Sequence, residues 1–236
     1  PYLGMEHQSA VTYGNGFTNG YNGTDLSGTG EGLKFDFIII HEAGHEWFAN
    51  SITNVDVADM WIHEGFTAYS ENLYLDYFFG KESSSRYVRG TRRRIQNRGP
   101  IRNPNRGVDA RGTGDMYYKG SNLLHTLRAA IGNDETWRQT LRNLNSHFRH
   151  QTVSSDELVA FITAELKDIR MDVPAFFTQY TQTTLIPTLE YRFTKTGLSY
   201  RWQNVVEGFN LPVLVRIANQ EPRYLFVSEK WEGIRV

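Results

Sequence analysis

The sequence predicts an α+β protein: a mainly helical domain with an N-terminal edge-strand segment, followed by a truncated antiparallel β domain. Two observations lead to this order. Helix caps and closing glycines recur before Pro187, whereas beyond it apolar residues alternate with polar ones, which is the period of a strand. With 39% hydrophobic and 14% aromatic residues, the 236-residue chain can build a sizeable core. We therefore expect two domains, at residues 1–187 and 188–236.

The N-terminal part predicts a strand, a long loop and a helix. Residues 1–13 indicate a strand or strand edge. Residues 14–32 are rich in Gly, Asn and Thr, which predicts a surface loop that is either a mobile connector or a functional lid. Residues 35–50 predict a helix. Its residues 37–40 are apolar on nearly every side, so we expect it to be buried.

Caps and closing residues predict further helices along the middle of the chain. They are residues 61–79 closed by Gly80, residues 82–96, residues 122–131 closed by Gly132, a helix from the cap Asp134 to about His150, one from the Ser154–Glu157 capping box to about Asp168, and a last one begun by Asp172 and Pro174. Residues 97–114 are rich in Gly, Pro, Asn and Arg and predict a loop.

Beyond Pro187 the pattern predicts strands. Apolar residues alternate with polar ones in residues 189–193 and again in residues 198–202, on either side of a turn at residues 195–197, which predicts a hairpin. Residues 213–217 and 224–227 predict two more strands. These few strands cannot close a β-sandwich. We therefore expect a partial β domain.

Composition excludes several classes of function. A formal net charge of −1 gives no electrostatic reason to expect nucleic acid or an anionic membrane as a partner. The absence of cysteine removes disulfides, zinc–thiolate sites and thiol nucleophiles, and fits a cytosolic or an exported bacterial protein equally. No apolar run is long enough to span a bilayer. The chain opens on Pro1 in mid-pattern, which suggests a piece of a longer protein.

The segment from His41 to His45, His-Glu-Ala-Gly-His, predicts a metal site. Residues four apart share a helix face, so both imidazoles can bind one ion. Two His and one Glu are a standard ligand set for catalytic zinc, and Glu64, after a gap of eighteen residues, can supply the carboxylate. Glu42 lies about 100° further round the helix and can act as a general base on a zinc-activated water.

Glu71 follows Glu64 by two helical turns on the same face. It is expected either to contact a ligand His, as outer-shell carboxylates do, or to make a structural salt bridge. The sequence leaves both possibilities open.

Four segments occur in the order and spacing of the M1 family of zinc aminopeptidases, the gluzincins, and the chain resembles that family over about residues 1–180. The segments are Gly4-Met5-Glu6, His41 to Phe48, Trp61 to Phe66, and Tyr117-Tyr118-Lys119-Gly120. The family's catalytic domain is similar to thermolysin. Residues 188–236 resemble the start of the β-sandwich that follows it in many members, whereas the family's N-terminal β domain and C-terminal helical domain have no counterpart here.

The resemblance implies roles for individual residues. His41, His45 and Glu64 are implied as ligands of one Zn²⁺ per chain, with Glu42 as general base. Tyr117 is implied as the phenol that hydrogen-bonds the oxyanion, with Tyr118 as its competitor.

The resemblance also implies a substrate-binding segment, Leu3-Gly4-Met5-Glu6, in which Glu6 pairs with the free α-ammonium of a peptide and main chain lies beside the substrate. Leu3 and His7 depart from the family's usual Gly and Asn, which concerns substrate geometry. His7 and His63 are expected to be structural.

The leading hypothesis is therefore a zinc metallo-aminopeptidase acting on peptides with a free N-terminus. The alternatives are an epoxide-hydrolase-like or a non-catalytic peptide-binding member of the same fold; an endopeptidase is disfavoured by Glu6. The Arg-rich residues 86–111 predict a solvated face, or else one arginine that meets a substrate carboxylate, with Arg102, Arg106 and Arg111 as candidates. We also expect the domains outside this chain to complete the site.

Overall fold

The computed structural model describes residues 3–195, 197–217 and 220–235. Its α-helices are α1 (Phe37–Gly44), α2 (Trp61–Phe79), α3 (Lys81–Thr91), α4 (Tyr118–Ile131), α5 (Asp134–His147), α6 (Ser155–Glu165) and α7 (Val173–Gln182). Short 3-10 helices are η1 (Glu31–Leu33), η2 (Val57–Asp59), η3 (Arg92–Arg94) and η4 (Gly114–Met116). This mixture of helix and strand is the α+β class that the sequence predicts.

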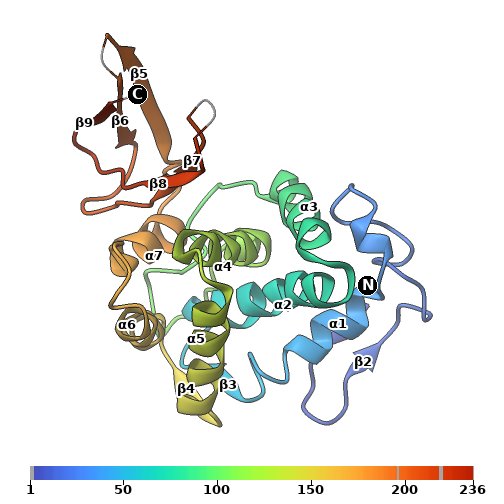
Figure 1. Cartoon of the computed structure of the whole chain (residues 1–236). Helices are drawn as coiled ribbons and strands as arrows, with labels where there is room; N and C mark the ends of the chain where they lie inside the picture. Colours follow the sequence, from blue (N-terminus) through green and yellow to red (C-terminus); the bar gives the residue numbers. More distant parts are fainter. Residues whose placement is uncertain (1–2, 196, 218–219, 236) are drawn as a thin grey trace.

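Helix α2 runs through the middle of the helical part and packs against α1, α3 and α4 (Figure 1). The spacing between these helices is set by small residues. A Cβ on Gly120 of α4 would lie 2.7 Å from the Cα of Gly65 in α2, and a Cβ on Gly44 of α1 would lie 3.1 Å from the Cβ of Ser70 in α2. Gly44 inside α1 is therefore explained by the close approach of that helix to α2.

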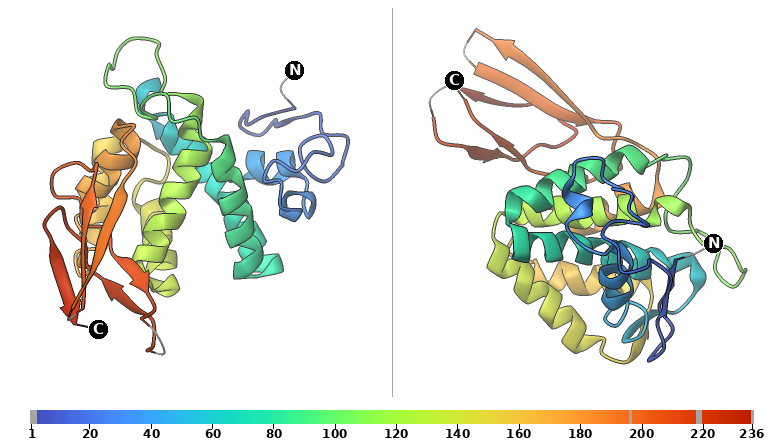
Figure 2. Two further views of the ribbon diagram at one scale, coloured as in Figure 1. Left: turned by 90° about the horizontal axis from the view of Figure 1, so that it is seen from above. Right: turned by 90° about the vertical axis from the view of Figure 1, so that its right-hand side faces the viewer.

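The strands form small sheets at the edges of the helical part. Antiparallel β1 (Gly4–Met5) and β2 (Thr12–Tyr13) replace the single strand expected over residues 1–13. A parallel pair that sequence patterns did not indicate joins β3 (Ile52–Asn54) to β4 (Gln151–Val153). The β1–β2 hairpin and the C-terminal strands lie on opposite sides of the helices (Figure 2).

The C-terminal segment holds the predicted hairpin. Strand β5 (Thr188–Thr194) pairs antiparallel with β6 (Gly197–Gln203), and β9 (Glu232–Arg235) adds a third strand. Strands β7 (Val213–Val215) and β8 (Arg223–Leu225) form a second antiparallel pair, shifted slightly from the expected ranges. Trp202 and Phe209 belong to the same hydrophobic cluster as Trp61 and Phe177 of the helical part, so the apolar core continues across residue 187. The division at that residue stays a prediction.

Several predicted boundaries need correction. Helix α1 ends at Gly44 rather than near residue 50, because the N–H groups of Glu46 and Trp47 bond to carbonyls only three residues back. Further on, Ala49 has a φ of 152°, which no helix accommodates. Helix α4 begins at Tyr118 rather than Asn122. Asn133, not Asp134, caps α5, since its side chain accepts from the Thr136 N–H. The Ser154–Glu157 capping box and the Asp172 cap are confirmed.

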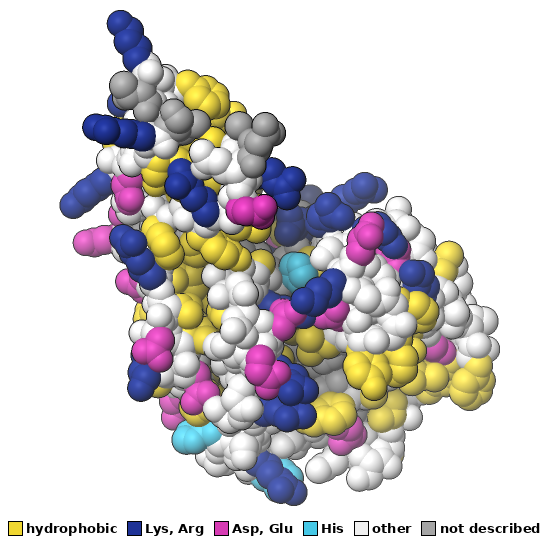
Figure 3. Space-filling view, viewed as in Figure 1, with side chains coloured by type: hydrophobic (Ala, Val, Ile, Leu, Met, Phe, Trp, Pro, Cys, Tyr) yellow, Lys and Arg dark blue, Asp and Glu magenta, His cyan; other side chains and the backbone are white. Residues whose placement is uncertain are grey.

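The surface agrees with the near-neutral composition. Basic and acidic side chains are interspersed on the face shown in Figure 3 instead of forming a field of one sign. Among the described residues, none of the helices combines the length and apolar character that crossing a membrane requires.

Candidate metal centre

Two adjacent helices bring the predicted ligands together. Helix α1 starts where the Asp36 side chain accepts from the N–H groups of Ile38 and Ile39, and it carries His41 and His45 on one face. Helix α2 carries Glu64 in its first turn. The Nε2 atoms of both histidines lie 3.5 Å from Glu64 Oε2, and all three residues are buried. The three donor atoms therefore converge on one point.

The outer hydrogen bonds of the histidines orient them for a cation. His45 Nδ1 lies 3.0 Å from the Phe48 carbonyl oxygen. Because a carbonyl only accepts, Nδ1 carries the proton and Nε2 presents its lone pair to the centre. His41 Nδ1 lies 2.9 Å from Glu71 Oε1, a carboxylate oxygen that accepts. His41 therefore also carries its proton on Nδ1 and presents the lone pair of Nε2 to the centre. The Thr67 hydroxyl, 3.0 Å from His45 Nδ1, adds a contact to this arrangement.

The donor set fits a zinc ion. Glu64 Oε2 is buried and has no hydrogen-bond partner, which is costly for a carboxylate unless a cation satisfies it. Tetrahedral ligands about 2 Å from zinc lie about 3.3 Å apart, close to the 3.5 Å separations of the two nitrogens from this oxygen. Burial disfavours the charged form of Glu64, but the neighbouring imidazoles of His41 and His45 outweigh it and hold its pKa well below the usual range. Glu64 is therefore ionised, as a metal ligand has to be.

His41 lies between two carboxylates. Burial opposes its protonated form, but Glu64 and Glu71 outweigh burial and raise the pKa of His41 to about 10. A cation bound at Nε2 would take the place of that proton, as metal ligation generally requires.

Glu42 lies beside the centre with its carboxylate against main chain. A Cβ on Gly4 would lie 2.2 Å from Glu42 Oε1, so only glycine leaves room for this carboxylate. Burial raises the pKa of Glu42, and the charges of Glu6 and Glu64 act in the same direction against the opposing effect of the histidines. A raised pKa suits a carboxylate that has to take up a proton.

The substrate-binding segment predicted at the N-terminus reaches the same place. Atoms of Glu6, Glu42 and His45 that can act as ligands lie within 4.8 Å of one another. The Glu6 carbonyl oxygen accepts from Asn50 Nδ2 at 3.1 Å, which ties the segment to the residues after α1. One edge of the segment pairs with β2 and Gly14. The Leu3 carbonyl oxygen accepts from the Gly14 N–H at 2.7 Å, and Met5 lies opposite Thr12.

Tyr117 also borders the centre. It caps α4, and its ring stacks on the His41 imidazole with centroids 6.0 Å apart. Burial and the charge of Glu64 raise the pKa of Tyr117 well above its ordinary value, so the phenol keeps its proton. Burial and the charge of Glu71 raise the pKa of Tyr118, so this phenol keeps its proton as well.

The sequence did not indicate two residues that contact His45 or Glu71. Thr67 lies three residues after Glu64, and helical spacing alone could have suggested it. Tyr87, whose hydroxyl donates to Glu71 Oε2 at 2.6 Å, comes from α3 and carries no local signal.

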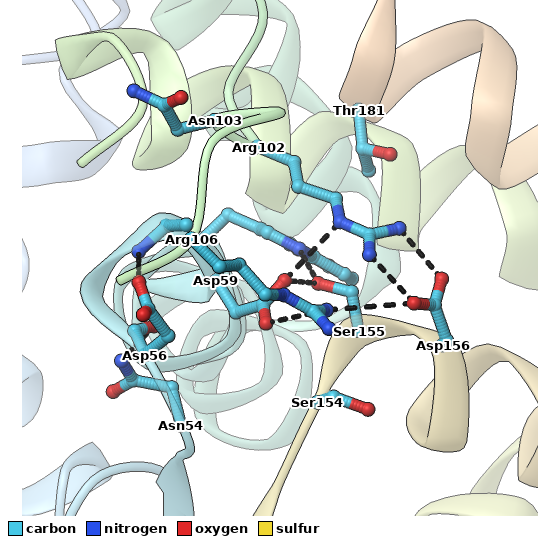
Figure 4. Close-up of polar contacts among 12 residues, drawn as sticks. Asn54, Asp56, Asp59, Arg102, Asn103, Arg106, Ser154, Ser155, Asp156 and Thr181 are labelled. Atoms are coloured by element: carbon cyan, nitrogen blue, oxygen red, sulfur yellow. Dashed lines mark hydrogen bonds and ion pairs between the residues drawn. The ribbon is translucent and has the colours of Figure 1, made fainter. Parts of the chain in front are cut away.

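Two of the three arginines considered for binding a substrate carboxylate pair with aspartates of this chain instead. Arg102 makes paired hydrogen bonds of 2.7 and 2.8 Å to the Asp156 carboxylate and lies 3.2 Å from buried Asp59 (Figure 4). Arg106 reaches Asp59 as well, at 2.9 Å. These contacts are structural. Arg111 is exposed and close enough to Tyr117 to oppose the rise in the pKa of that phenol.

The two histidines that the sequence predicts to be structural, His63 and His7, take part in local contacts. His63 Nε2 accepts from the Asn54 N–H at 2.8 Å, and burial lowers the pKa of His63 to about 4, so it is a neutral acceptor. His7 is exposed and lies 3.3 Å from the Thr12 hydroxyl across the β1–β2 hairpin.

Comparison with known proteins agrees with this geometry. A model of the peptidase family M1 domain matches residues 1–180. The chain is 29% identical to leukotriene A-4 hydrolase of Xenopus laevis over 143 residues, which are 56% of this chain and 24% of that protein. It is 27% identical to human aminopeptidase B over 156 residues, which are 59% of this chain and 24% of that protein. The chain thus spans about a quarter of the length of these relatives.

Solved structures show the same fold. An M1 zinc metallopeptidase from Deinococcus radiodurans has a TM-score of 0.61 at 20% identity, over 80% of this chain and 38% of that chain. Aminopeptidase A of Legionella pneumophila, in complex with aspartic acid, has a TM-score of 0.70 at 16% identity, over 100% of this chain and 28% of that chain. At such identities the likeness concerns the fold alone.

Proposed function

The chain belongs to peptidase family M1, and on that premise we propose that it is a zinc metallo-aminopeptidase that hydrolyses the N-terminal peptide bond of peptides. The observation that carries the proposal is the convergence of His41, His45 and Glu64 on one point, with Glu42 and Glu6 beside it. One zinc ion per chain, on a thermolysin-like arrangement of the two ligand helices, is part of the proposal.

The mechanism assigns one task to each side chain. Zinc bound by the three ligands would supply the Lewis acidity that makes water nucleophilic near neutral pH. Glu42 takes the proton of the attacking water and passes it to the leaving amine, a role that its raised pKa favours. Tyr117 donates a hydrogen bond to the oxyanion of the tetrahedral intermediate, which its firmly held proton permits.

Glu6 restricts the reaction to chain ends. Its carboxylate lies beside Glu42 and can pair with the α-ammonium of a peptide, an interaction that an internal peptide bond does not offer. The main chain of Leu3 and Gly4, together with Met5, borders the same position and would contact the first substrate residues.

A second candidate is an epoxide-hydrolase-like activity on the same centre. The similarity to leukotriene A-4 hydrolase favours it, since that relative's name denotes another hydrolytic substrate. A non-catalytic peptide-binding role fits less well, because a base and an oxyanion donor accompany the ligands. The parts of the relatives without counterpart here are proposed to complete the substrate pocket.

The test is hydrolysis of aminoacyl-arylamides with free and N-acetylated amines by the zinc-loaded protein and its Glu42→Gln variant. Cleavage of the free-amine substrates alone, abolished in the variant, is the expected result. Cleavage of acetylated substrates would refute Glu6 as the amine anchor. No cleavage of either, with one equivalent of zinc bound, would favour the epoxide-hydrolase-like or non-catalytic alternatives.

A further inference from the structure

A buried hydrogen-bond chain leads away from the metal centre. His41 Nδ1 lies 2.9 Å from Glu71 Oε1, and the Tyr87 hydroxyl donates to Glu71 Oε2 at 2.6 Å. Each oxygen of the Glu71 carboxylate therefore has its own partner. The three residues come from α1, α2 and α3, so the chain links three helices at one point.

Burial makes these bonds sensitive to geometry. Glu71 and Tyr87 are each only 1% exposed, so water does not replace a lost partner. Hydrogen bonds to a desolvated carboxylate are among the stronger ones in proteins. A Glu71 carboxylate without the Tyr87 donor would be free to turn, and the orientation of His41 would change with it.

Tyr87 is held firmly in its own place. Its ring packs edge-on against Phe35, with centroids 5.8 Å apart, just before the start of α1. On another side, a Cβ on Gly32 would lie 3.4 Å from the ring. Burial, followed by the charge of Glu71, raises the pKa of Tyr87 far above its usual value. Its hydroxyl is thus a permanent donor.

We propose that Tyr87 is a positioning residue of the metal centre. Its hydrogen bond holds the Glu71 carboxylate in the orientation that accepts the His41 Nδ1 proton, and this presents His41 Nε2 to the cation. The proposal rests on the zinc site of the proposed function, but it is independent of the substrate and of catalysis. It predicts that removing one hydroxyl outside the ligand set weakens zinc binding.

Tyr69 provides a matched control. It is also 1% exposed and its hydroxyl also has a buried partner, accepting from Trp137 Nε1 at 2.9 Å. This hydrogen bond involves neither Glu71 nor one of the proposed zinc ligands. Tyr69→Phe therefore removes a hydroxyl of similar burial on the same helix as Glu71, without touching the chain to His41.

The experiment measures zinc affinity by competition with a chromogenic chelator, together with the visible spectrum of the Co²⁺-substituted protein. We expect Tyr87→Phe to weaken zinc binding about tenfold and to alter the Co²⁺ spectrum, since outer-shell partners typically contribute 10- to 100-fold in affinity. Tyr69→Phe should stay within about twofold of wild type in zinc affinity, whatever its effect on melting temperature.

A double-mutant cycle with Glu71→Gln tests whether Tyr87 acts through Glu71. In the Glu71→Gln background, Tyr87→Phe should add little further loss of zinc affinity. Wild-type affinity and an unchanged Co²⁺ spectrum in Tyr87→Phe would overturn the proposal while leaving the zinc site intact. Equal losses in Tyr69→Phe and Tyr87→Phe would also overturn it, as a general packing effect. Absence of zinc binding by wild type would refute the metal centre itself.

Discussion

Gly65 and Gly120 touch where α2 crosses α4: a Cβ on Gly120 would come within 2.7 Å of the Gly65 Cα. Gly65 follows Glu64, and Gly120 lies three residues after Tyr117. This glycine pair therefore sets how close the proposed oxyanion donor comes to the proposed metal ligand. Neither helix can move away without separating the two side chains.

Gly120→Ala should accordingly damage both stability and activity. The added methyl has backbone on its far side and cannot be absorbed by a side-chain movement, so we expect a loss of about 1–3 kcal/mol in the free energy of unfolding. Urea denaturation measures this. Gly114→Ala is the control, because a Cβ there meets nothing within 4 Å. Equal stability of the two variants would show that the helices adjust.

Glu42→Gln should abolish turnover while zinc stays bound. The amide cannot take a proton from water, so we expect kcat to fall by at least about 10²-fold, in the range of general-base contributions. Metal content and kcat are measured on the same preparation. Loss of zinc along with activity would place Glu42 among the ligands instead.

Tyr117→Phe should lower kcat with little change in KM, because the oxyanion forms only after the substrate is bound. Removing one such donor typically costs about 10²–10³ in kcat. Tyr118→Phe is the matched control on the adjacent residue. If the Tyr118 variant shows the larger loss of kcat, the assignment of the two phenols has to be exchanged.

Glu31 should make the stability of the protein depend on acid pH. Burial alone would raise its pKa, but hydrogen bonds from Lys34, Ser83 and Arg86 lower it to about 2, below the ordinary 4.5. The unfolded chain thus binds this proton first, so the stabilisation is fully present above about pH 4.5 and is lost as the pH falls towards 2. Glu31→Gln should flatten the dependence of the unfolding free energy on pH within that window. An unchanged slope would exclude Glu31 as its source.

Arg102→Ala should cost stability without changing specificity. It leaves buried Asp59 with fewer cationic neighbours, and breaking a buried pair costs about 3 kcal/mol or more where no other partner remains. Arg106 still reaches Asp59, so we expect about 1–2 kcal/mol in the free energy of unfolding. The ratio of kcat/KM for peptides with free and amidated C-termini should stay as in wild type. A changed ratio would indicate that Arg102 contacts the C-terminal carboxylate of the substrate.

The sequence could indicate which side chains converge because most of them lie close together along two helices. His41, Glu42 and His45 share one helical turn, and Glu71 follows Glu64 at a helical repeat. For Glu71 the sequence left open a contact with a ligand His or a separate salt bridge. The 2.9 Å distance from Glu71 Oε1 to His41 Nδ1 favours the contact with the proposed ligand His41.

Contacts between distant segments were out of reach. Tyr87 meets Glu71 only because α3 folds back on α2, and β3 pairs with β4 across about a hundred residues through three residue pairs. Strands this short have no period to detect. The end of α1 was missed because the main chain tightens into a turn directly after Gly44, and the side-chain pattern does not record that change.

The continuity of the core across residue 187 decides where the chain can be shortened without exposing apolar surface. The family model ends at residue 180, yet Trp202 and Phe209 share a hydrophobic cluster with Trp61. The residues beyond 180 therefore contribute to the same hydrophobic core. A protein cut at residue 180 would expose the apolar surface that these residues cover and would tend to aggregate, so the part that folds stably extends beyond the part that the family model matches.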